Sequence, residues 1–380
     1  MIDDIAEKIY SGRRIDIKDA KRLYEHSNLA ELGMLAHWVR QKLNPERVVT
    51  YNIGRNINYT NVCWVKCNFC AFYRKPGAEG GYVLSDEEIC AKIEELIEFG
   101  GDQPKSCEIL MQGGLNSKLR LDYYERIFSM IRKQYPQVQL HCLSATEIIY
   151  IAHLSQLSIE DTLGRLFSAG LDSIPGAGAE ILVDRVRNVI GKGKDLTEEW
   201  LEVHRVAHRL GIPTTATMMY GHVESIEERI EHLVRIRDLQ DECAGFRAFI
   251  TWNFQPEHTE LAVDLEHWDG TKTTGLDHLR TVAVSRLFLD NIDHLQASWV
   301  TQGPKIAQVS LRYGVDDFGS TMLEENVVSA AGTSHTDEMT LPEMERLILD
   351  AGFQPQRRDT QYRRVNTPSV EREGRVVALS

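Results

Sequence analysis

Short apolar or β-branched runs alternate along the chain with longer amphipathic segments. The runs predict strands at 48–57, 107–111, 138–143, 170–174, 214–220, 246–252 and 294–300. Several intervening segments begin with the Ser/Thr-x-x-Glu pattern of a helix capping box, at 85–88, 225–228 and 340–343. Strands that alternate with helices indicate βα units and a parallel sheet. Because many such units follow one another, we predict an α/β fold of the closed or nearly closed, TIM-like (β/α) barrel type.

The pattern also suggests how the chain is divided. Residues 1–47 are expected to form a helical extension, residues 48–355 the barrel core, and residues 356–380 a polar tail. No GxGxxG motif follows the first predicted strand, which argues against a dinucleotide-binding fold. Polar or glycine-rich stretches follow most of the predicted strands. Since the chemistry of such barrels lies at the carboxyl ends of the strands, we expect an enzyme with a large substrate.

Charge and hydropathy narrow the class of protein. The 380 residues include 43 Lys and Arg against 56 Asp and Glu, a formal net charge of −13. This balance argues against nucleic-acid binding and against binding to an anionic membrane surface. There is no apolar run of about 18 residues that would span a bilayer. The charged start, residues 1–8, lacks the apolar core of a signal peptide, so we expect a cytoplasmic protein.

The chain contains seven cysteines, an odd number that argues against a disulfide framework. Three of them form a CxxxCxxC pattern just after the first predicted strand: Cys63, Cys67 and Cys70. The other four stand singly in apolar surroundings and are expected to be small buried side chains: Cys90, Cys107, Cys142 and Cys243.

The clustered thiolates are soft ligands that suit an iron–sulfur cluster or zinc. A structural zinc site would need a fourth ligand and usually two ligand pairs, and no second pair lies nearby in the sequence. His141 or His222 would complete such a site only by a coincidence of folding. Three thiolates on a [4Fe–4S] cluster leave one iron open to a substrate or cofactor. We therefore favour the cluster, with a zinc knuckle or ordinary buried thiols as the alternatives.

The cysteine motif, with Phe69 as its aromatic position, resembles that of the radical S-adenosylmethionine (SAM) superfamily. The resemblance implies that Cys63, Cys67 and Cys70 hold a [4Fe–4S] cluster and that SAM binds its open iron. One electron from the reduced cluster would then release a 5′-deoxyadenosyl radical. The electron would come from a one-electron reductant such as a flavodoxin or ferredoxin.

Further stretches resemble the futalosine branch of menaquinone biosynthesis, above all the cyclic dehypoxanthine futalosine synthase family. They lie at 58–63, 70–74, 179–185, 215–224, 296–305 and 321–333. The resemblance implies hydrogen abstraction from C4′ of the ribose in dehypoxanthine futalosine, followed by carbon–carbon ring closure onto its benzoate. Aminofutalosine synthases and the radical enzymes of deazaflavin cofactor synthesis share the cysteine motif and are the alternative. A non-catalytic zinc-binding barrel would be a different class.

The segment Gln112, Gly113 and Gly114 resembles the Gly-Gly-Glu segment whose backbone binds the SAM amino group. Here Leu115 takes the acidic position, so only main-chain recognition is expected to survive, and a tight turn is the alternative.

Two side chains after later strands, Ser144 and Glu180, would contact SAM or the neighbouring substrate by the same resemblance. Helix capping by Ser144 and a surface charge at Glu180 are the alternatives, and Glu147 could exchange roles with Ser144.

The loss of a proton that ends the implied reaction needs a base. We nominate His222 and Glu224, which follow the strand at 214–220, although a structural histidine is as plausible. Arg165 was considered for the SAM carboxylate, but its context favours a solvated helix position.

The candidate substrate wall comprises Gln255, Trp299, Thr301, Gln302 and Glu324. Trp299 offers a flat face for an aryl group, or else belongs to the core. A carboxylate-bearing substrate would also require a local cation at the mouth of the barrel of this acidic protein.

Overall fold

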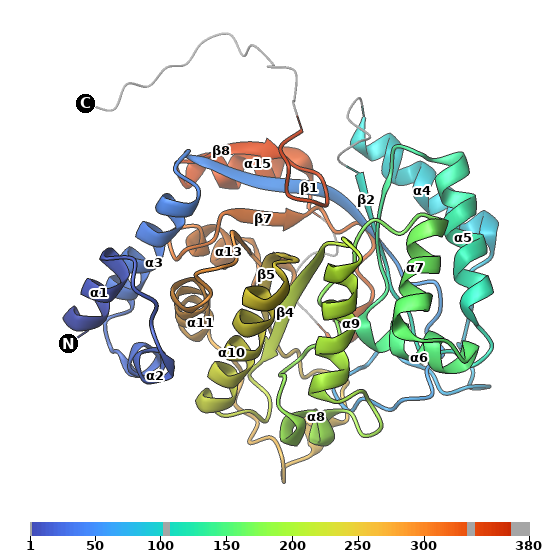
Figure 1. Ribbon diagram of the computed structural model, residues 1–380, viewed down its shortest axis with the longest axis horizontal. Helices are drawn as coiled ribbons and strands as arrows, with labels where there is room; N and C mark the ends of the chain where they lie inside the picture. Colours follow the sequence, from blue (N-terminus) through green and yellow to red (C-terminus); the bar gives the residue numbers. More distant parts are fainter. Residues whose placement is uncertain (1, 102–106, 333–338, 366–380) are drawn as a thin grey trace.

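The computed structural model describes residues 2–101, 107–332 and 339–365. Its centre is a curved sheet in which every strand pair is parallel (Figure 1). The strands are β1 (Val48–Ile57), β2 (Cys107–Met111), β3 (Gln139–Cys142), β4 (Thr214–Tyr220), β5 (Phe246–Asn253), β6 (His294–Gln296), β7 (Asp317–Ser320) and β8 (Gln354–Arg357). Their order is β3-β2-β1-β7-β6-β5-β4, and β8 pairs with the first half of β1.

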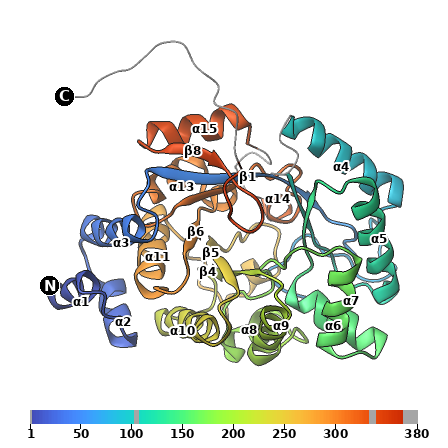
Figure 2. The same cartoon turned by 45° about the horizontal axis from the view of Figure 1, so that its top comes forward.

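Helices surround the sheet on its outer side (Figure 2). They are α1 (Asp3–Tyr10), α2 (Ile17–Glu25), α3 (Leu29–Leu43), α4 (Asp86–Gly100), α5 (Leu121–Gln134), α6 (Ala145–Ser155), α7 (Ile159–Ala169), α8 (Asp184–Ile190), α9 (Thr197–Arg209), α10 (Ile226–Cys243), the 3₁₀ turn η2 (Leu261–Val263), α11 (Gly275–Phe288), α12 (Trp299–Gln302), α13 (Pro304–Ser310), α14 (Val327–Ala330) and α15 (Leu341–Asp350). Ser85 and Ser225 form the predicted capping boxes, and Thr340 accepts from the backbone N–H of Glu343, which is one half of the box predicted there.

The sheet is closed between β3 and β4 only by single bridges. His141 bridges to Ser173, and Ile174 bridges to Thr214. The predicted strand at 170–174 is reduced to these bridging residues, because Gly170 ends helix α7 with a positive φ of 125°. The architecture is therefore a nearly closed (β/α) barrel, as the sequence predicts.

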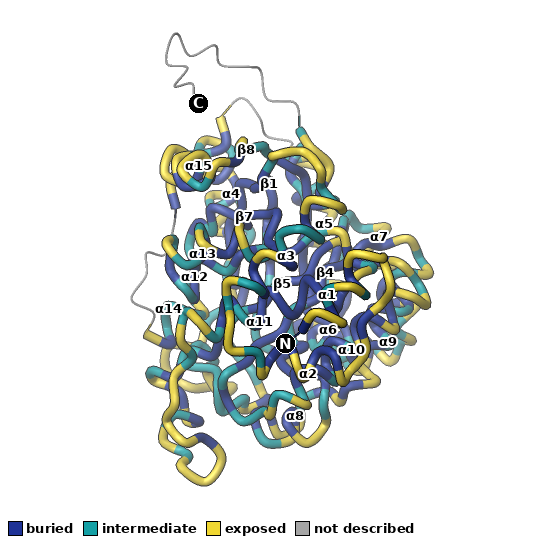
Figure 3. The backbone as a smooth tube through the Cα atoms, turned by 90° about the vertical axis from the view of Figure 1, so that its left-hand side faces the viewer, coloured by how far each residue is buried: buried dark blue, intermediate teal, exposed yellow. Residues whose placement is uncertain are grey.

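Alternation along the strands separates an outer face from the lumen, the space that the sheet encloses. In β2, Cys107 and Ile109 are fully buried, and the Cys107 thiol donates to the Leu96 carbonyl of α4. Their neighbours Glu108 and Leu110 therefore face the lumen. Figure 3 shows the central strands mostly buried, while the helices expose their outer sides.

Helices α1 to α3 precede β1 and lie beside α10 and α11 (Figure 1). Gly33 of α3 lets the ring of Tyr313 approach, because a Cβ atom there would lie 2.7 Å from that ring. None of the described helices has both the length and the apolar composition that a bilayer crossing requires.

The sequence misplaced two features of the sheet. The strand expected at 294–300 ends at Gln296, and Trp299 begins helix α12 instead. Strands β7 and β8 were not predicted, because neither has an apolar alternation. β7 begins with the buried Asp317, and β8 is a polar strand with no fully buried residue.

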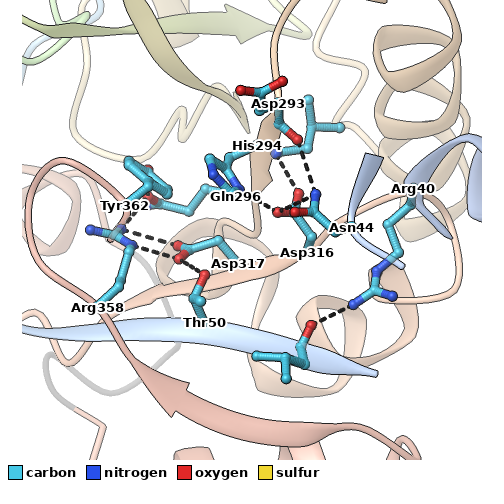
Figure 4. A network of polar contacts seen from close by, with 12 residues as sticks. Arg40, Asn44, Thr50, Asp293, His294, Gln296, Asp316, Asp317, Arg358 and Tyr362 are labelled. Carbon is cyan, nitrogen blue, oxygen red and sulfur yellow. Dashed lines mark hydrogen bonds and ion pairs between the residues drawn. The ribbon is translucent and has the colours of Figure 1, made fainter. Parts of the chain in front are cut away.

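After β8 the chain returns into the barrel at the amino ends of the strands. Arg358 donates two hydrogen bonds to Asp317, at 2.6 and 3.1 Å, and Tyr362 donates its hydroxyl proton to Gln296 at 2.9 Å (Figure 4). We call residues 358–362 the plug, because they close this end of the lumen.

The plug also contacts β2 and β3. The Thr360 hydroxyl donates to Glu108 at 2.7 Å, and the Thr360 backbone N–H donates to Gln139 at 2.6 Å. This segment belongs to the polar tail that the sequence predicts at 356–380, of which residues 366–380 lie outside the described residues.

Candidate active site

The cysteine loop, residues 58–84, follows β1 at the carboxyl end of the barrel. The backbone N–H of Trp64 donates to the Leu115 carbonyl at 3.2 Å, and that of Asn68 donates to the Ile190 carbonyl at 2.9 Å. The Asn68 carbonyl in turn accepts from Leu261 at 2.8 Å. The segment after β2, the end of α8 and the segment after β5 therefore hold the loop in place.

The three thiols of this loop are half-buried. Burial raises the pKa of Cys63 and Cys70, and it raises that of Cys67 to about 12. Backbone N–H groups of Tyr73 and Phe72 act in the opposite direction on Cys70. Without a metal these thiols are protonated, and a bound metal would displace the protons because its ligands must be thiolates.

The spacing of the sulfur atoms tests which metal group fits. Among the described residues, the only group of three or more His, Cys, Asp or Glu ligand atoms all within 4.8 Å is Asp264, Glu266 and His267. The three cysteines are therefore spread more widely than around one tetrahedral zinc, whose Zn–S distance of about 2.3 Å puts the sulfurs roughly 3.8 Å apart. A [4Fe–4S] cluster binds each thiolate at a different iron, so it does not require the three sulfur atoms to lie this close together.

The Gly113–Gly114 segment lies directly against the cysteine loop. A Cβ atom on Gly113 would lie 2.8 Å from the ring of Tyr59, and one on Gly114 would collide with the Val62 carbonyl. The Gly114 N–H donates to the Thr60 carbonyl at 2.9 Å. Two residues without side chains are needed here, so that the backbone after β2 borders the cysteines.

A buried carboxylate, Glu147, orients this glycine segment. It accepts from the Gly113 N–H at 2.9 Å and from the Tyr59 hydroxyl at 2.8 Å. It also accepts from the N–H and hydroxyl of Ser144, both at 2.7 Å, in the capping box of α6. Burial raises the pKa of Glu147, although these hydrogen bonds oppose the shift. The hydroxyl of Ser144 is thus engaged with Glu147, and the Ser-x-x-Glu spacing was the signal for this pair.

A buried ion pair lies on the other side of the cysteines. Lys194 donates to Glu180 at 2.5 Å and to the Gly178 carbonyl at 2.7 Å. Its ammonium group is 5.7 Å from the centre of the Phe69 ring, and its charge acts to lower the pKa of Cys67. The sequence analysis found Phe69 and Glu180 but missed Lys194, whose only signal was the glycine-rich basic stretch at 191–194.

Arg187 fixes the loop that carries Glu180. Arg187 donates to the Ala179 carbonyl at 2.6 Å and forms a fully buried ion pair with Asp195 at 2.5 Å. Glu180 itself has a φ of +45°, an uncommon backbone conformation for a residue with a side chain. These contacts hold the carboxylate toward Lys194.

His222 and Glu224 follow β4, and their polar atoms are engaged within their own loop. His222 contacts the Met219 carbonyl through Nε2 at 2.9 Å, and its Nδ1 accepts from the Val223 N–H at 2.8 Å. Glu224 accepts from Arg229 at 2.8 Å and from two backbone N–H groups. Burial acts to raise its pKa, but His222, Arg229 and the backbone outweigh burial and lower it. These hydrogen bonds fix the conformation of the loop that follows β4.

Three of the expected wall residues lie together at the ends of β5 and β6. Gln255 donates to the carbonyls of Asn253 and Thr301, at 3.2 and 3.4 Å, and Gln302 donates to the Asn253 side chain. The Thr301 hydroxyl is 2.8 Å from that of Ser298. Asn253, which the sequence analysis did not select, links the group.

The two remaining wall residues lie elsewhere. Trp299 is 1% exposed, and its indole N–H donates to the Ser320 carbonyl at 2.8 Å. Glu324 forms ion pairs with Arg55 and Lys92, both at 2.5 Å, beside a surface groove of about 620 Å³ between α4 and α14. Neither joins the group around Asn253.

Comparisons with known proteins agree with this geometry. Residues 57–236 match the model of the radical SAM superfamily, and residues 243–371 match the model of the CofH/MqnC C-terminal region. The chain is 46% identical to a cyclic dehypoxanthine futalosine synthase of Halalkalibacterium halodurans, over 96% of this chain and 95% of that protein. It is 42% identical to an aminodeoxyfutalosine synthase of Thermus thermophilus, over 95% of each chain.

A solved structure shows the same fold at low sequence identity. Methylornithine synthase superposes with a TM-score of 0.71 and 16% identity, over 92% of this chain and 96% of that chain. At this identity the likeness concerns the fold alone.

Proposed function

Since the chain belongs to the radical SAM superfamily, in the group of the cyclic dehypoxanthine futalosine and aminodeoxyfutalosine synthases, we propose that it converts dehypoxanthine futalosine to its cyclic form. This is a step of menaquinone biosynthesis. The observation that carries the proposal is the cysteine loop, which lies against Gly113–Gly114 at the carboxyl end of a nearly closed barrel. The similarity to the Halalkalibacterium enzyme over nearly the whole chain supports the choice of substrate.

The residues around the cysteines suit the two cofactors. Cys63, Cys67 and Cys70 would hold a [4Fe–4S] cluster, and the Gln112–Gly114 backbone with the Glu180–Lys194 pair would hold SAM. Together these cofactors supply a 5′-deoxyadenosyl radical after one-electron reduction. We propose a flavodoxin or ferredoxin as the reductant. Glu180 is acceptor-only and suits a ribose diol or an ammonium group, while Lys194 suits a carboxylate.

We place the substrate in the lumen of the barrel. The plug closes its amino end and the cysteine loop lies at its carboxyl end, so a reactive carbon radical would be shielded from solvent. Hydrogen abstraction at ribose C4′ leaves a radical that bonds to the benzoate ring, and the loss of one proton and one electron restores aromaticity. Gln255, Thr301 and Gln302 would border the substrate from the side of β5 and β6.

The test is a paired anaerobic assay of the reconstituted enzyme with reductant and SAM. With dehypoxanthine futalosine we expect 5′-deoxyadenosine and a product two hydrogens lighter than the substrate. Unchanged dehypoxanthine futalosine, together with turnover of an enolpyruvyl benzoate, would instead assign aminofutalosine synthesis. A colourless, iron-free protein after reconstitution would refute the radical reading, and Cys67→Ala is the negative control.

A further inference from the structure

The inner faces of the first three strands form one layer midway along the lumen. In β3, Leu140 and Cys142 are fully buried on the outer face, so His141 between them faces the lumen. Strand register pairs His141 with Leu110, and Leu110 with Asn56. Asn56, Leu110 and His141 therefore lie side by side on the inner surface.

This layer lies between the plug and the cofactor segment. Glu108 and Gln139, two residues earlier on β2 and β3, carry the hydrogen bonds of Thr360 in the plug. Gln112, two residues after Leu110, begins the glycine segment beside the cysteines. Because two residues of a strand span about 6.6 Å, His141 lies roughly one side-chain layer from each boundary.

One ring nitrogen of His141 has a hydrogen-bond partner, and the other has none among the described residues. Nδ1 lies 2.6 Å from the Ser173 hydroxyl. Within the described part of the chain no partner is found for Nε2, and the residue is 8% exposed. When Nδ1–H donates to Ser173, Nε2 carries the lone pair that faces the lumen. His222, by contrast, has backbone partners on both nitrogens.

The surroundings keep His141 in its neutral form. The charged groups that act on it are Glu108 of β2, Arg358 of the plug and Asp172, which precedes its partner Ser173. Burial outweighs the two carboxylates and lowers the pKa of His141. Neutral imidazole is the form that accepts a proton.

We propose that Nε2 of His141 is the base that takes the proton lost when the substrate ring regains its aromaticity. The inference rests on the proposed function. The ring carbon that has bonded to C4′ lies next to the unpaired electron and still holds its hydrogen. As that C–H bond breaks, the proton goes to Nε2, two of the three electrons complete the aromatic sextet, and the third leaves to a one-electron acceptor of the iron–sulfur class.

The test compares His141→Gln with His222→Gln in the reconstituted enzyme, and it measures 5′-deoxyadenosine and cyclic product separately. A lost general base typically costs 10²- to 10⁴-fold. We expect His141→Gln to form 5′-deoxyadenosine within about two-fold of the unchanged enzyme, while cyclic product falls at least ~100-fold. A substrate-derived radical should accumulate and be visible by electron paramagnetic resonance. His222→Gln tests the residue nominated from the sequence: a raised ratio of 5′-deoxyadenosine to product in that variant, with an unchanged ratio in His141→Gln, would overturn the proposal.

An unchanged product ratio and no radical signal in His141→Gln would overturn the proposal. Should that variant fail to bind iron, Ser173→Ala decides the question, because it removes only the partner that orients the ring. An increased ratio of 5′-deoxyadenosine to product supports the role of His141, and an unchanged ratio refutes it. Failure of the unchanged enzyme to form cyclic product would refute the proposed function instead, so the two failures are distinguishable.

Discussion

The two ends of the barrel differ in how their polar groups are paired. At the amino end, buried charges form ion pairs, as in Arg358 with Asp317 (Figure 4) and Arg286 with Asp316. At the carboxyl end, glycines bring backbone close to three thiols, and the cysteine loop is held mainly by backbone hydrogen bonds. Buried polar groups that have partners stabilise the amino end of the barrel, while polar groups that lack partners remain available to bind ligands.

This difference separates stability from chemistry within one fold. Breaking a buried ion pair leaves a charge without compensation and destabilises the protein strongly. Removing one of the three thiols of the cysteine loop costs little packing, but it should prevent the proposed cluster from binding. Changes at the two ends should therefore affect different measurements.

The largest expected effect on chemistry is that of Cys67→Ala at the carboxyl end. We expect complete loss of cluster binding, seen as loss of iron and of visible absorbance, and no 5′-deoxyadenosine. The free energy of unfolding of the metal-free protein should change by no more than about 1 kcal/mol, because only one sulfur atom is removed. A variant that retains its full iron content would contradict the ligand role of Cys67.

The largest expected effect on stability is that of Arg358→Met in the plug. Asp317 would remain buried without its partner, so the free energy of unfolding should fall by about 3–5 kcal/mol in urea titrations. Arg363→Met is the matched control, since the Arg363–Asp359 pair lies on the same segment and Arg363 is 67% exposed. Equal destabilisation by both variants would show that the plug is not held by its buried pair.

Glu147→Gln tests whether the glycine segment needs its carboxylate. The amide keeps the shape but cannot accept all the hydrogen bonds from Gly113, Tyr59 and Ser144. Losing one hydrogen bond to a charged group costs about 1.5 kcal/mol, so SAM should bind roughly 10-fold more weakly to the reconstituted enzyme. Calorimetry would measure this, with the exposed Glu87→Gln as control. Unchanged SAM affinity would remove Glu147 from the site.

The stability of the amino end of the barrel should also depend on pH. Although burial acts to raise the pKa of Asp316, His294, Arg286 and a backbone N–H lower it. A lowered pKa means that the stabilising contribution is present above the unfolded value of about 3.9 and is lost as the pH falls through the folded value. The melting temperature of the unchanged protein should fall below about pH 4 more steeply than that of Asp316→Asn. Parallel curves would argue against this contribution.

The smallest effect is expected at Arg165, which belongs to neither end. It pairs with Glu125 on the surface at 2.6 Å and is half exposed. Arg165→Ala should change the free energy of unfolding by less than about 0.5 kcal/mol and leave SAM affinity unchanged. A clear loss of SAM binding would restore Arg165 as a candidate ligand.

Local patterns in the sequence determined much of this structure. The capping boxes at Ser85 and Ser225 formed as expected, because each joins residues only three positions apart. The nearly closed barrel followed from the alternation of strands and helices. The CxxxCxxC spacing singled out the cysteine loop, because all three thiols lie within one short segment. The division into domains and the roles of the individual site residues remain predictions.

Only the tertiary structure decided which groups meet across the barrel. Glu147 reaches Gly113, and Thr360 reaches Glu108, through contacts that join residues far apart in sequence. Tertiary contacts also engaged both nitrogens of His222 and left one nitrogen of His141 facing the lumen. Composition and periodicity indicate the local structure around a residue. Strand register and helix packing set its distant neighbours, and these decide whether a polar side chain is satisfied or available for chemistry.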